Sequence, residues 1–387
     1  MAPLKRIGIL TGGGDVPGLN AAIKAVVRRA AVHDIEVLGL RRGWLGPMSI
    51  NPDDPATLEK WTLDLPLGRV RRIDRYGGTI LHSSRTNPAN MRPDKIPPFA
   101  REDCVPTERG TWDCTKYVLK VLERLNLDAL IAIGGDDTLG YAARLHREGF
   151  QIMAIPKTMD NDVNGTEYCI GFSTAVTRAV TNVTNFRTTV GSHERVGVME
   201  VFGRNAGYTA LFTGLLADAH RVAIPEVPFD MDKLIDYLLE DREANPSHYS
   251  ILVISEGAYP KGGTVMESGE ADAYGHRKLG GIGYVVAQEI KKRGVNIMYQ
   301  QLGYIMRGGP PDLLDRMVAM NFGLLAMDSL LAGQSGRMVG IQQGQYTTVP
   351  LEVVAQGARS VDVDRFYDAE QYKPYVRDVE GLPMFLY

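Results

Sequence analysis

The residues best suited to chemistry lie in one heptapeptide, residues 156–162, which reads Pro-Lys-Thr-Met-Asp-Asn-Asp. It directly follows the short apolar run Ile152–Ile155. If this segment is extended, the carboxylates of Asp160 and Asp162 fall on the same side of the backbone, beside the ammonium group of Lys157. Two carboxylates and one cation suit a metal ion and a phosphoryl group. Taken alone, the stretch is equally typical of a surface turn rich in Asp and Asn.

Two further turns rich in glycine and aspartate follow apolar runs in the same way, at residues 11–15 and 134–138. The runs before them, Arg6–Leu10 and Asp128–Ile133, are typical of buried parallel strands, and a helical pattern follows each turn. Ligands bind at the carboxyl ends of strands in open α/β sheets, and helix N-termini bind phosphate. Together with residues 156–162, these two turns predict a single site that binds phosphate and metal. The first turn matches neither a Walker A loop nor GxGxxG.

Strand-like and helical segments alternate along the chain and must position these turns. The expected strands are 6–10, 35–40, 128–133, 152–155, 196–201 and 250–254, and the expected longer helices are 113–125, 173–190, 280–293 and 312–332. Residues 86–111 contain five prolines and no periodicity, which predicts a long surface loop or lid. The tail from Gln342 is weakly patterned, with aromatic residues from Tyr346 to Tyr387, and is expected to pack across a domain or subunit surface.

Composition excludes several classes of function. The 387 residues carry a net charge of −3, which gives no overall basic field for nucleic acid. The basic clusters Arg69–Arg72 and Lys291–Arg293 are short and predict solvated faces. Three cysteines, Cys104, Cys114 and Cys169, form no CxxC pair and favour free thiols in a reducing compartment. No apolar run is long enough for a membrane span, so we expect a soluble cytoplasmic protein.

Taken together, the motifs resemble those of the phosphofructokinase family along about residues 6–345. A single Gly-Gly-Asp turn is weak evidence for this family, because NAD kinases and lipid kinases carry a similar turn. Five motifs in the family's order are specific. They are the phosphate loop Thr11–Asn20, the metal and phosphate turn 134–138, the catalytic signature 156–162, and the sugar-phosphate segments Phe202–Arg204 and Gly303–Gly309.

The resemblance implies an α/β fold with two similar three-layer αβα domains, mainly parallel sheets and an active site in the cleft between them. It implies a larger phosphoryl-donor domain (1–171 and 306–355) and a smaller sugar-phosphate domain (172–305 and 356–387). The implied reaction transfers a phosphoryl group to the 1-hydroxyl of fructose 6-phosphate, with Mg²⁺ as cofactor, small-molecule substrates, and no nucleic-acid or membrane partner. A homodimer or homotetramer is inferred from the family.

The resemblance also assigns roles within the catalytic signature. Asp160 matches the general base that accepts the proton of the sugar hydroxyl, and Thr158 matches the hydroxyl that positions the phosphoryl group. Asp136 and Asp162 match the carboxylates that hold Mg²⁺ directly or through water, as oxygen ligands suit a hard cation.

Other matched residues surround this centre. Arg85 and Arg204 match arginines that stabilise the charge of the transferring phosphoryl group, and Arg195 and Arg307 match groups that bind the 6-phosphate of the sugar. Glu256 matches an acceptor for sugar hydroxyls. The remaining matched positions are Gly13, Gly14, Asp137, Thr138 and Lys157 for the donor, and Thr158, Met159, Asp160, Phe202, Gly203, Arg204 and Tyr304 for the sugar phosphate.

Two residues bear on whether the donor is pyrophosphate or ATP. ATP-using members usually have glycine at the position of Asp137, where a carboxylate would repel the α-phosphate and occupy its volume. Lys157 replaces another small residue and places an ammonium group near a terminal phosphate. This pair resembles the pyrophosphate-dependent branch. Some ATP-dependent relatives also carry the lysine, so ATP stays open as the alternative donor.

The sequence departs from the compact ATP enzymes at two further positions. Tyr304 stands where many of them have a histidine beside the sugar phosphate. Met298 stands where they often have an arginine that reaches into a neighbouring subunit's site. The 6-phosphate therefore has fewer obvious cationic partners, and sedoheptulose 7-phosphate stays open as a second acceptor.

Overall fold

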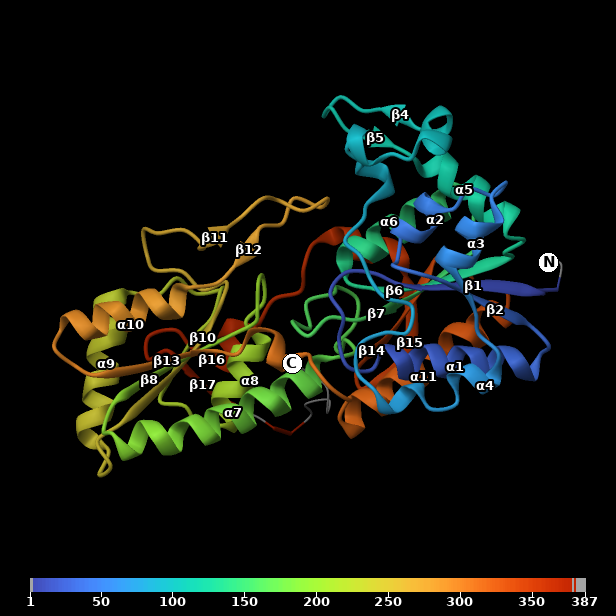
Figure 1. Cartoon of the computed structure of the whole chain (residues 1–387). Coiled ribbons are helices and arrows are strands. Elements are labelled where there is room, and N and C mark those ends of the chain that lie inside the picture. Colours follow the sequence, from blue (N-terminus) through green and yellow to red (C-terminus); the bar gives the residue numbers. More distant parts are fainter. Residues whose placement is uncertain (1–2, 378, 381–387) are drawn as a thin grey trace.

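Two sheets covered by helices form the two lobes of the chain in the computed structural model, which describes residues 3–377, 379 and 380 (Figure 1). In order across the sheet, the larger lobe has β15 (Gln345–Pro350), β14 (Arg337–Gln342), β7 (Ile152–Pro156), β6 (Ala129–Gly134), β1 (Arg6–Thr11), β2 (Glu36–Leu40) and β3 (Thr62–Asp64). The smaller lobe has β13 (Ile297–Gln301), β8 (Val196–Val201), β10 (Ser250–Ser255) and β9 (Arg221–Ala223).

Most neighbouring strands in both sheets run parallel. Among the described residues, the exceptions in these two sheets are the outer strands β3 and β15, which pair antiparallel with β2 and β14. Parallel neighbours bring their carboxyl ends to the same edge of a sheet. This arrangement confirms the predicted α/β class with mainly parallel sheets. The exact domain boundaries stay a prediction, and residues 381–387 of the smaller domain lie outside the described residues.

The apolar runs of the larger lobe are continuous because both faces of its sheet are buried. Along β6, Ile131 and Ile133 lie in one core cluster, whereas Leu130 and Ala132 lie in the other. Helices α1 (Leu19–Val32) and α11 (Leu313–Leu331) contribute to the first cluster, and α5 (Thr115–Arg124) and α6 (Asp136–Arg147) contribute to the second. A strand buried on both faces shows no alternation of polar and apolar residues.

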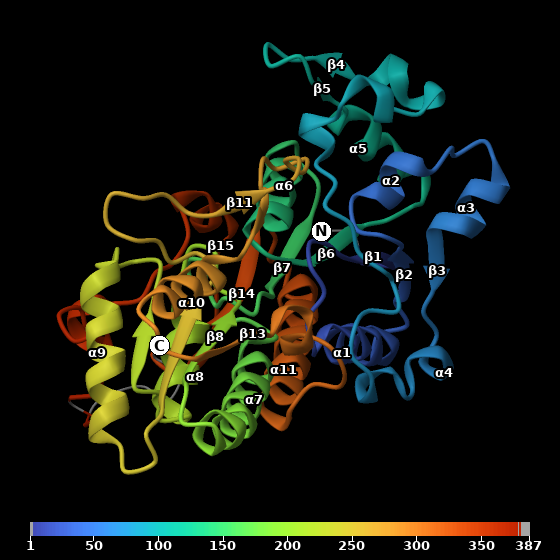
Figure 2. The same ribbon diagram turned by 60° about the vertical axis from the view of Figure 1, so that its left-hand side comes forward.

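The helices of the smaller lobe surround its four strands (Figure 2). They are α7 (Phe172–Ser192), α8 (Tyr208–Leu216), α9 (Met231–Ala244) and α10 (Ile282–Lys292). The predicted helices 173–190, 280–293 and 312–332 agree with α7, α10 and α11 to within two residues at each end. The apolar stripe of α7 is core, as predicted, with Val176 and Val183 buried.

The tail is more regular than its sequence suggests. Residues 345–350 form β15, which completes the larger sheet beside β14. Further on, Tyr367 and Tyr372 are buried against the smaller sheet, where the Tyr367 hydroxyl donates to the carbonyl of Val222 at 2.6 Å. The weak patterning reflects an outer strand with exposed residues, followed by short segments whose packing is set by single aromatic side chains. Phe385 and Tyr387 lie outside the described residues.

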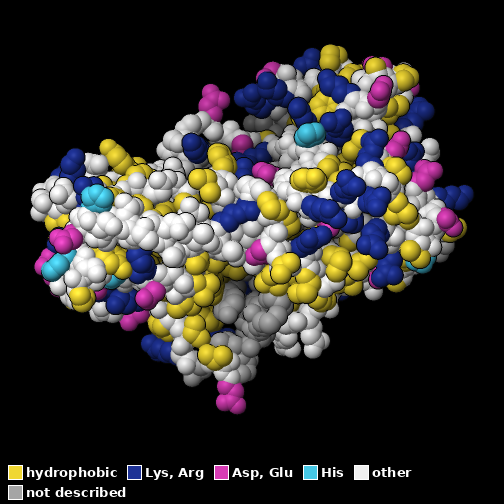
Figure 3. Space-filling model, turned by 60° about the horizontal axis from the view of Figure 1, so that its bottom comes forward, with side chains coloured by type: hydrophobic (Ala, Val, Ile, Leu, Met, Phe, Trp, Pro, Cys, Tyr) yellow, Lys and Arg dark blue, Asp and Glu magenta, His cyan; other side chains and the backbone are white. Residues whose placement is uncertain are grey.

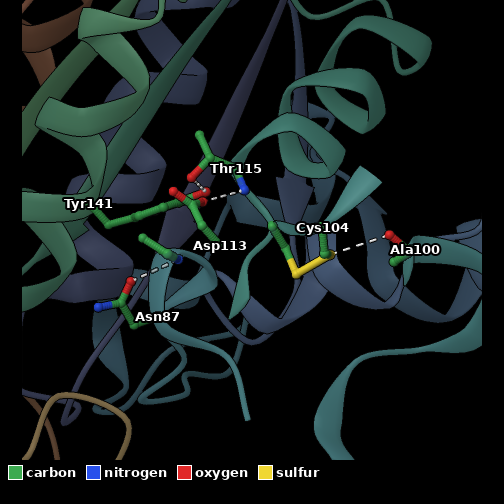
Figure 4. Close-up of a disulfide and its surroundings, with 8 residues drawn as sticks. Asn87, Ala100, Cys104, Asp113, Thr115 and Tyr141 are labelled. Atoms are coloured by element: carbon green, nitrogen blue, oxygen red, sulfur yellow. Dashed lines mark hydrogen bonds between the residues drawn. A yellow bond between two sulfur atoms is a disulfide. The ribbon is translucent and has the colours of Figure 1, made fainter. Parts of the chain in front are cut away.

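The expectation of free thiols is wrong for two of the three cysteines. Cys104 and Cys114 form a disulfide, with Cα atoms 4.2 Å apart, and Cys169 is free and buried (Figure 4). The bridge closes residues 104–114 into a loop. There, β4 (Val105–Pro106) and β5 (Trp112–Asp113) pair antiparallel, which brings the flanking cysteines together. The sequence did not reveal this pairing, because the two cysteines are ten positions apart and no strand pattern is visible between them.

The surface agrees with the charge analysis. Arg69, Arg71 and Lys291 are exposed, which confirms the two basic clusters as solvated faces. One face of the molecule shows Lys and Arg side chains interspersed with hydrophobic and acidic ones (Figure 3). No helix within residues 3–377, 379 and 380 combines the length and apolarity that a bilayer crossing requires.

Asp315 joins the start of α7 to α11 and gives a prediction about stability. Its fully buried carboxylate accepts hydrogen bonds from the backbone N–H groups of Gly171 and Thr174 and from the hydroxyls of Tyr168 and Thr174. Asp315→Ala would leave these buried donors without an acceptor, which should lower the free energy of unfolding by about 3 kcal/mol. Urea denaturation followed by circular dichroism measures this. Asp328→Ala, also on α11, removes a partly exposed ion pair with Arg29 of α1 and should cost less than about 1 kcal/mol.

Candidate active site

The three predicted turns meet at one edge of the larger sheet. They follow β1, β6 and β7, which are neighbours in the sheet order. Residues from all three turns line one cavity of about 140 Å³, and the smaller lobe contributes Arg204 and Asn205 to its wall. The larger-lobe residues that line it include Gly13, Gly14, Arg85, Asp136, Asp137, Thr138, Lys157, Thr158, Asp160 and Asp162. The site therefore lies between the lobes.

The heptapeptide reaches this cavity by a different backbone path from the one expected. Residues 159–160 form a turn, and Asn161 has a φ of 55°, so the segment is not extended. Asparagine tolerates this left-handed conformation, and its side chain holds it by donating to the Glu167 carbonyl and accepting from the Cys169 N–H. Asp160 and Asp162 nevertheless line the same cavity.

Burial dominates the electrostatics of the carboxylates. It raises the pKa of Asp160, and it raises the pKa of Asp162 to about 8 with help from the negative charges of Asp160 and Asp136. The pKa of Asp136 is also raised, by burial and by Asp137. Clustered carboxylates with raised pKa values in a cleft are typical of a functional site. The Arg204 N–H donates to Oδ2 of Asp160 at 3.2 Å, which orients this carboxylate.

The carboxylates fit a magnesium ion that is shared with phosphate. No group of three or more His, Cys, Asp or Glu side chains among the described residues could hold a metal by itself. Mg²⁺ in proteins is usually held by one or two carboxylates together with water and substrate phosphates. Asp136 and Asp162 supply two such oxygen donors on the wall of the cavity. A site built for metal and phosphate together is consistent with both findings.

Lys157 and Gly13, both predicted to bind the donor, lie together at the cavity wall. The Lys157 side chain is buried, and its pKa is lowered to about 8 by burial and by the nearby Arg307 charge. A Cβ atom on Gly13, whose φ is 78°, would lie 2.9 Å from the Lys157 ammonium nitrogen. Glycine at this position therefore lets the ammonium group approach the backbone of the phosphate loop. Thr138 is buried beside it, in the first turn of α6.

Asp137 lies at the same helix terminus and has a partner that sequence reasoning missed. Its Oδ2 is 3.0 Å from Nε2 of His276, which comes from the smaller lobe. Tyr274 and His276 both line the cavity. They belong to residues 266–281, which contain the short antiparallel strands β11 (Glu267–Ser268) and β12 (Lys278–Leu279), and which we call the hairpin. The hairpin extends from the smaller lobe toward α6 (Figures 1 and 2).

The smaller lobe presents its own strand ends to the cleft. Phe202, Gly203 and Arg204 follow β8, and Glu256 follows the adjacent strand β10. Gly203 has a φ of 143°, and a Cβ there would lie 2.3 Å from Oγ of Ser255, so only glycine fits. Glu256 is buried, and burial together with Asp160 raises its pKa to about 8. The predicted sugar-hydroxyl acceptor therefore lies near the predicted base.

The predicted sugar-phosphate residues Tyr304 and Arg307 line a neighbouring hollow of about 710 Å³. This hollow shares Gly13, Gly14 and Arg85 with the first cavity. Arg307 lies over the Tyr304 ring, and its Nε is 3.4 Å from Oδ1 of Asp15. Tyr304 in turn contacts the Phe202 ring, with centroids 5.9 Å apart. Met159 is buried and lines neither hollow.

Arg195 is not brought to this site within one chain. It precedes β8, whereas Phe202–Arg204 follow the strand, so Arg195 lies at the opposite end. The resemblance assigned Arg195 a role from its sequence position, but the sequence does not show which end of the strand faces the cleft. Met298 lies within β13. The larger hollow is lined by Arg307 together with Tyr304, and Arg42 and Arg85 line it as well.

Known proteins are similar to this chain in sequence and in fold. The profile of the family described as Phosphofructokinase matches residues 6–330. A pyrophosphate--fructose 6-phosphate 1-phosphotransferase of Amycolatopsis methanolica is 40% identical over 370 residues, which covers 95% of this chain and 99% of the relative. An "ATP-dependent 6-phosphofructokinase 3" of Streptomyces coelicolor is 39% identical over 368 residues, covering 94% and 99%.

A solved structure has the same fold. The crystal structure of a pyrophosphate-dependent phosphofructokinase from Nitrosospira multiformis superimposes with a TM-score of 0.76 at 19% identity, covering 98% of this chain and 95% of that one. The fold, the order of the motifs and the family profile agree over most of the length. This chain is therefore an enzyme of the phosphofructokinase family.

Proposed function

We propose that the protein catalyses the Mg²⁺-dependent, reversible transfer of a phosphoryl group from pyrophosphate to the 1-hydroxyl of fructose 6-phosphate. The products are fructose 1,6-bisphosphate and phosphate. The observation that carries the choice of donor is the carboxylate of Asp137 on the cavity wall, fixed by His276. A negative charge there opposes the α-phosphate of a nucleotide. The cavity of about 140 Å³ is also small beside the roughly 300–1,000 Å³ of sites for drug-sized ligands.

The chemistry follows from the positions of the side chains. Asp160 accepts the proton of the sugar hydroxyl as its oxygen attacks phosphorus, and the P–O bond to the departing phosphate breaks. Its raised pKa makes it a stronger proton acceptor than an exposed carboxylate. Arg85 and Arg204 supply positive charge at the cavity wall, where the transferring group develops negative charge. Asp136 and Asp162 would hold Mg²⁺, which neutralises phosphate charge when it is bound.

The sugar phosphate is expected to occupy the side of the cleft formed by the smaller lobe and Arg307. Glu256, Phe202 and Gly203 lie at its strand ends, and Tyr304 and Arg307 line the adjoining hollow. We further infer a homodimer or homotetramer that acts in the cytoplasm on small molecules. Light scattering of the purified protein measures the oligomeric state.

A donor comparison tests the proposal. The purified enzyme is supplied with fructose 6-phosphate and either pyrophosphate or ATP, with Mg²⁺ or with excess EDTA. We expect fructose 1,6-bisphosphate with pyrophosphate and Mg²⁺, and a kcat/KM for ATP at least about 100-fold lower, which corresponds to a difference of about 2.7 kcal/mol between the two donors. Product with ATP alone would establish the alternative, an ATP-dependent 6-phosphofructokinase. Sedoheptulose 7-phosphate in place of fructose 6-phosphate tests the second acceptor.

Asp137→Gly should relax the choice of donor. Removing the carboxylate takes away both the repulsion and the volume that oppose an α-phosphate, so kcat/KM for ATP should rise by about tenfold, equivalent to about 1.4 kcal/mol. Asp53→Gly, at an exposed loop position, is the matched control and should leave the ratio of the two donors unchanged. An unchanged ratio in Asp137→Gly would show that Asp137 does not select the donor.

A further inference from the structure

The tip of the hairpin is a preformed turn. The Asp272 carboxylate accepts the backbone N–H groups of Tyr274 and His276, both at 3.0 Å. The Asp272 N–H donates to the His276 carbonyl, and the Gly275 N–H donates to the Asp272 carbonyl. These bonds fix the backbone that carries both side chains facing the cavity. The far end of the hairpin is also anchored, because the buried Glu200 accepts the N–H of Gly281 at 2.9 Å.

The same tip crosses from the smaller lobe to the larger one. Asp272 pairs with Arg85 at 3.2 Å, and the Tyr274 hydroxyl donates to the Thr86 carbonyl at 2.8 Å. The Asn90 side chain donates to the Ala273 carbonyl at 3.0 Å. On its own lobe, the hairpin accepts at the Arg277 carbonyl from the Arg204 guanidinium. Both arginines that line the catalytic cavity, Arg85 and Arg204, therefore contact the hairpin.

His276 is the tip residue that engages the donor machinery directly. Its imidazole is 3.0 Å from the Asp137 carboxylate, and both side chains are about one-third exposed at the cavity wall. Asp137 occupies the position where, by the family resemblance, ATP enzymes leave room for the α-phosphate. His276 and Tyr274 therefore cover the cavity beside that position, and they do so with side chains from the opposite lobe.

We propose that His276 is a donor-specificity residue, which holds the Asp137 carboxylate across the cavity and, with Tyr274, closes it around a donor as short as pyrophosphate. The inference rests on the proposed function, because it names the part of the chain that limits how long a phosphoryl donor the cavity can accept. A longer donor would have to displace the Asp137–His276 pair and open the hairpin. The contacts that the hairpin makes with the larger lobe would then be lost when a nucleotide binds, and this loss disfavours the nucleotide relative to pyrophosphate.

Steady-state kinetics of the full-length enzyme test this inference. His276→Ala should raise the KM for pyrophosphate by about tenfold, the loss of one charged hydrogen bond, while the KM for fructose 6-phosphate stays within about twofold. The kcat/KM for ATP should rise. His276→Gln, whose longer side chain places its amide N–H where Nε2 lies and can still donate to Asp137, should keep the KM for pyrophosphate within about threefold of the wild type. Lys278→Ala, an exposed change on β12, is the matched control and should resemble the wild type.

A double-mutant cycle separates pairing from general disruption. In an Asp137→Ala background, His276→Ala should change the KM for pyrophosphate by less than about twofold, because its partner is already gone. An unchanged KM in the single variant, equal increases for both substrates, or the same increase in both backgrounds would overturn the inference. If His276→Ala does not fold, His276→Asn, whose shorter side chain cannot place its amide where Nε2 lies, replaces it in the same cycle. A wild type that uses only ATP overturns the proposed function itself, which the donor comparison shows independently.

Discussion

Asp160→Asn is expected to lower kcat by about 10³-fold while the protein stays folded and binds both substrates, because general-base catalysis typically contributes about 10²–10⁴. Asparagine has nearly the same shape, and its carbonyl oxygen can still accept the Arg204 N–H. It cannot take the proton of the sugar hydroxyl. The reaction in both directions passes through the same transition state, so the rate from fructose 1,6-bisphosphate and phosphate should fall equally.

The measurement is kcat at saturating concentrations of both substrates, in each direction. Asp94→Asn changes an exposed carboxylate of the larger lobe and serves as the control, with kcat as in the wild type. A fall of less than about tenfold in Asp160→Asn, well below the usual contribution of a base, would remove Asp160 from that role.

Lys157→Met is expected to reduce kcat/KM for pyrophosphate by about 10²–10³, the range for loss of one buried donor to developing phosphate or oxyanion charge. The Lys157 side chain is only 4% exposed, so water cannot replace its ammonium group. Methionine fills the same space without charge. The KM for fructose 6-phosphate should stay within about twofold, because Lys157 borders the donor loop at Gly13. Equal losses for both substrates would contradict a specific donor role.

The pH profile provides a second readout for Lys157. Its pKa is lowered to about 8, so the ammonium form predominates at neutral pH and is lost as the pH rises through 8. The affinity for an anionic donor depends on the charged form. In the wild type, kcat/KM for pyrophosphate should therefore fall above about pH 8, since this quantity reports groups of the free enzyme. This fall should be absent in Lys157→Met. Lys278→Ala should keep the wild-type profile.

The site was predictable where short-range signals coincide with strand order. Each of the turns at 11–15, 134–138 and 156–162 follows a buried apolar strand, and β1, β6 and β7 are neighbours in the sheet. A parallel sheet then brings the turns to one edge, whatever the detailed path of each backbone. For this reason the three turns line one cavity, although residues 159–161 turn where an extended segment was expected.

The parts that the prediction missed have different causes. The hairpin depends on contacts between residues far apart in sequence, such as Asp137 with His276, and has no periodicity of its own. Strand β13 is half-exposed along its length, which leaves no apolar run to detect. Helix α9 is different, because its N-cap Asp230 and the spacing of Leu234, Ile235 and Leu238 were readable signals that the prediction omitted. The Cys104–Cys114 bridge required tertiary proximity.

The discontinuous build of the larger sheet has a consequence for how the chain is made. Strand β14 pairs with β7, yet almost half of the chain lies between Pro156 and Arg337. During synthesis from the N-terminus, the larger lobe must wait with the edge of β7 unpaired until the whole smaller sheet, residues 196–301, has been produced. The smaller lobe's four strands lie in one continuous stretch and can complete their sheet before β14 has been made. The nascent larger lobe is therefore the part that most needs protection from aggregation before translation ends.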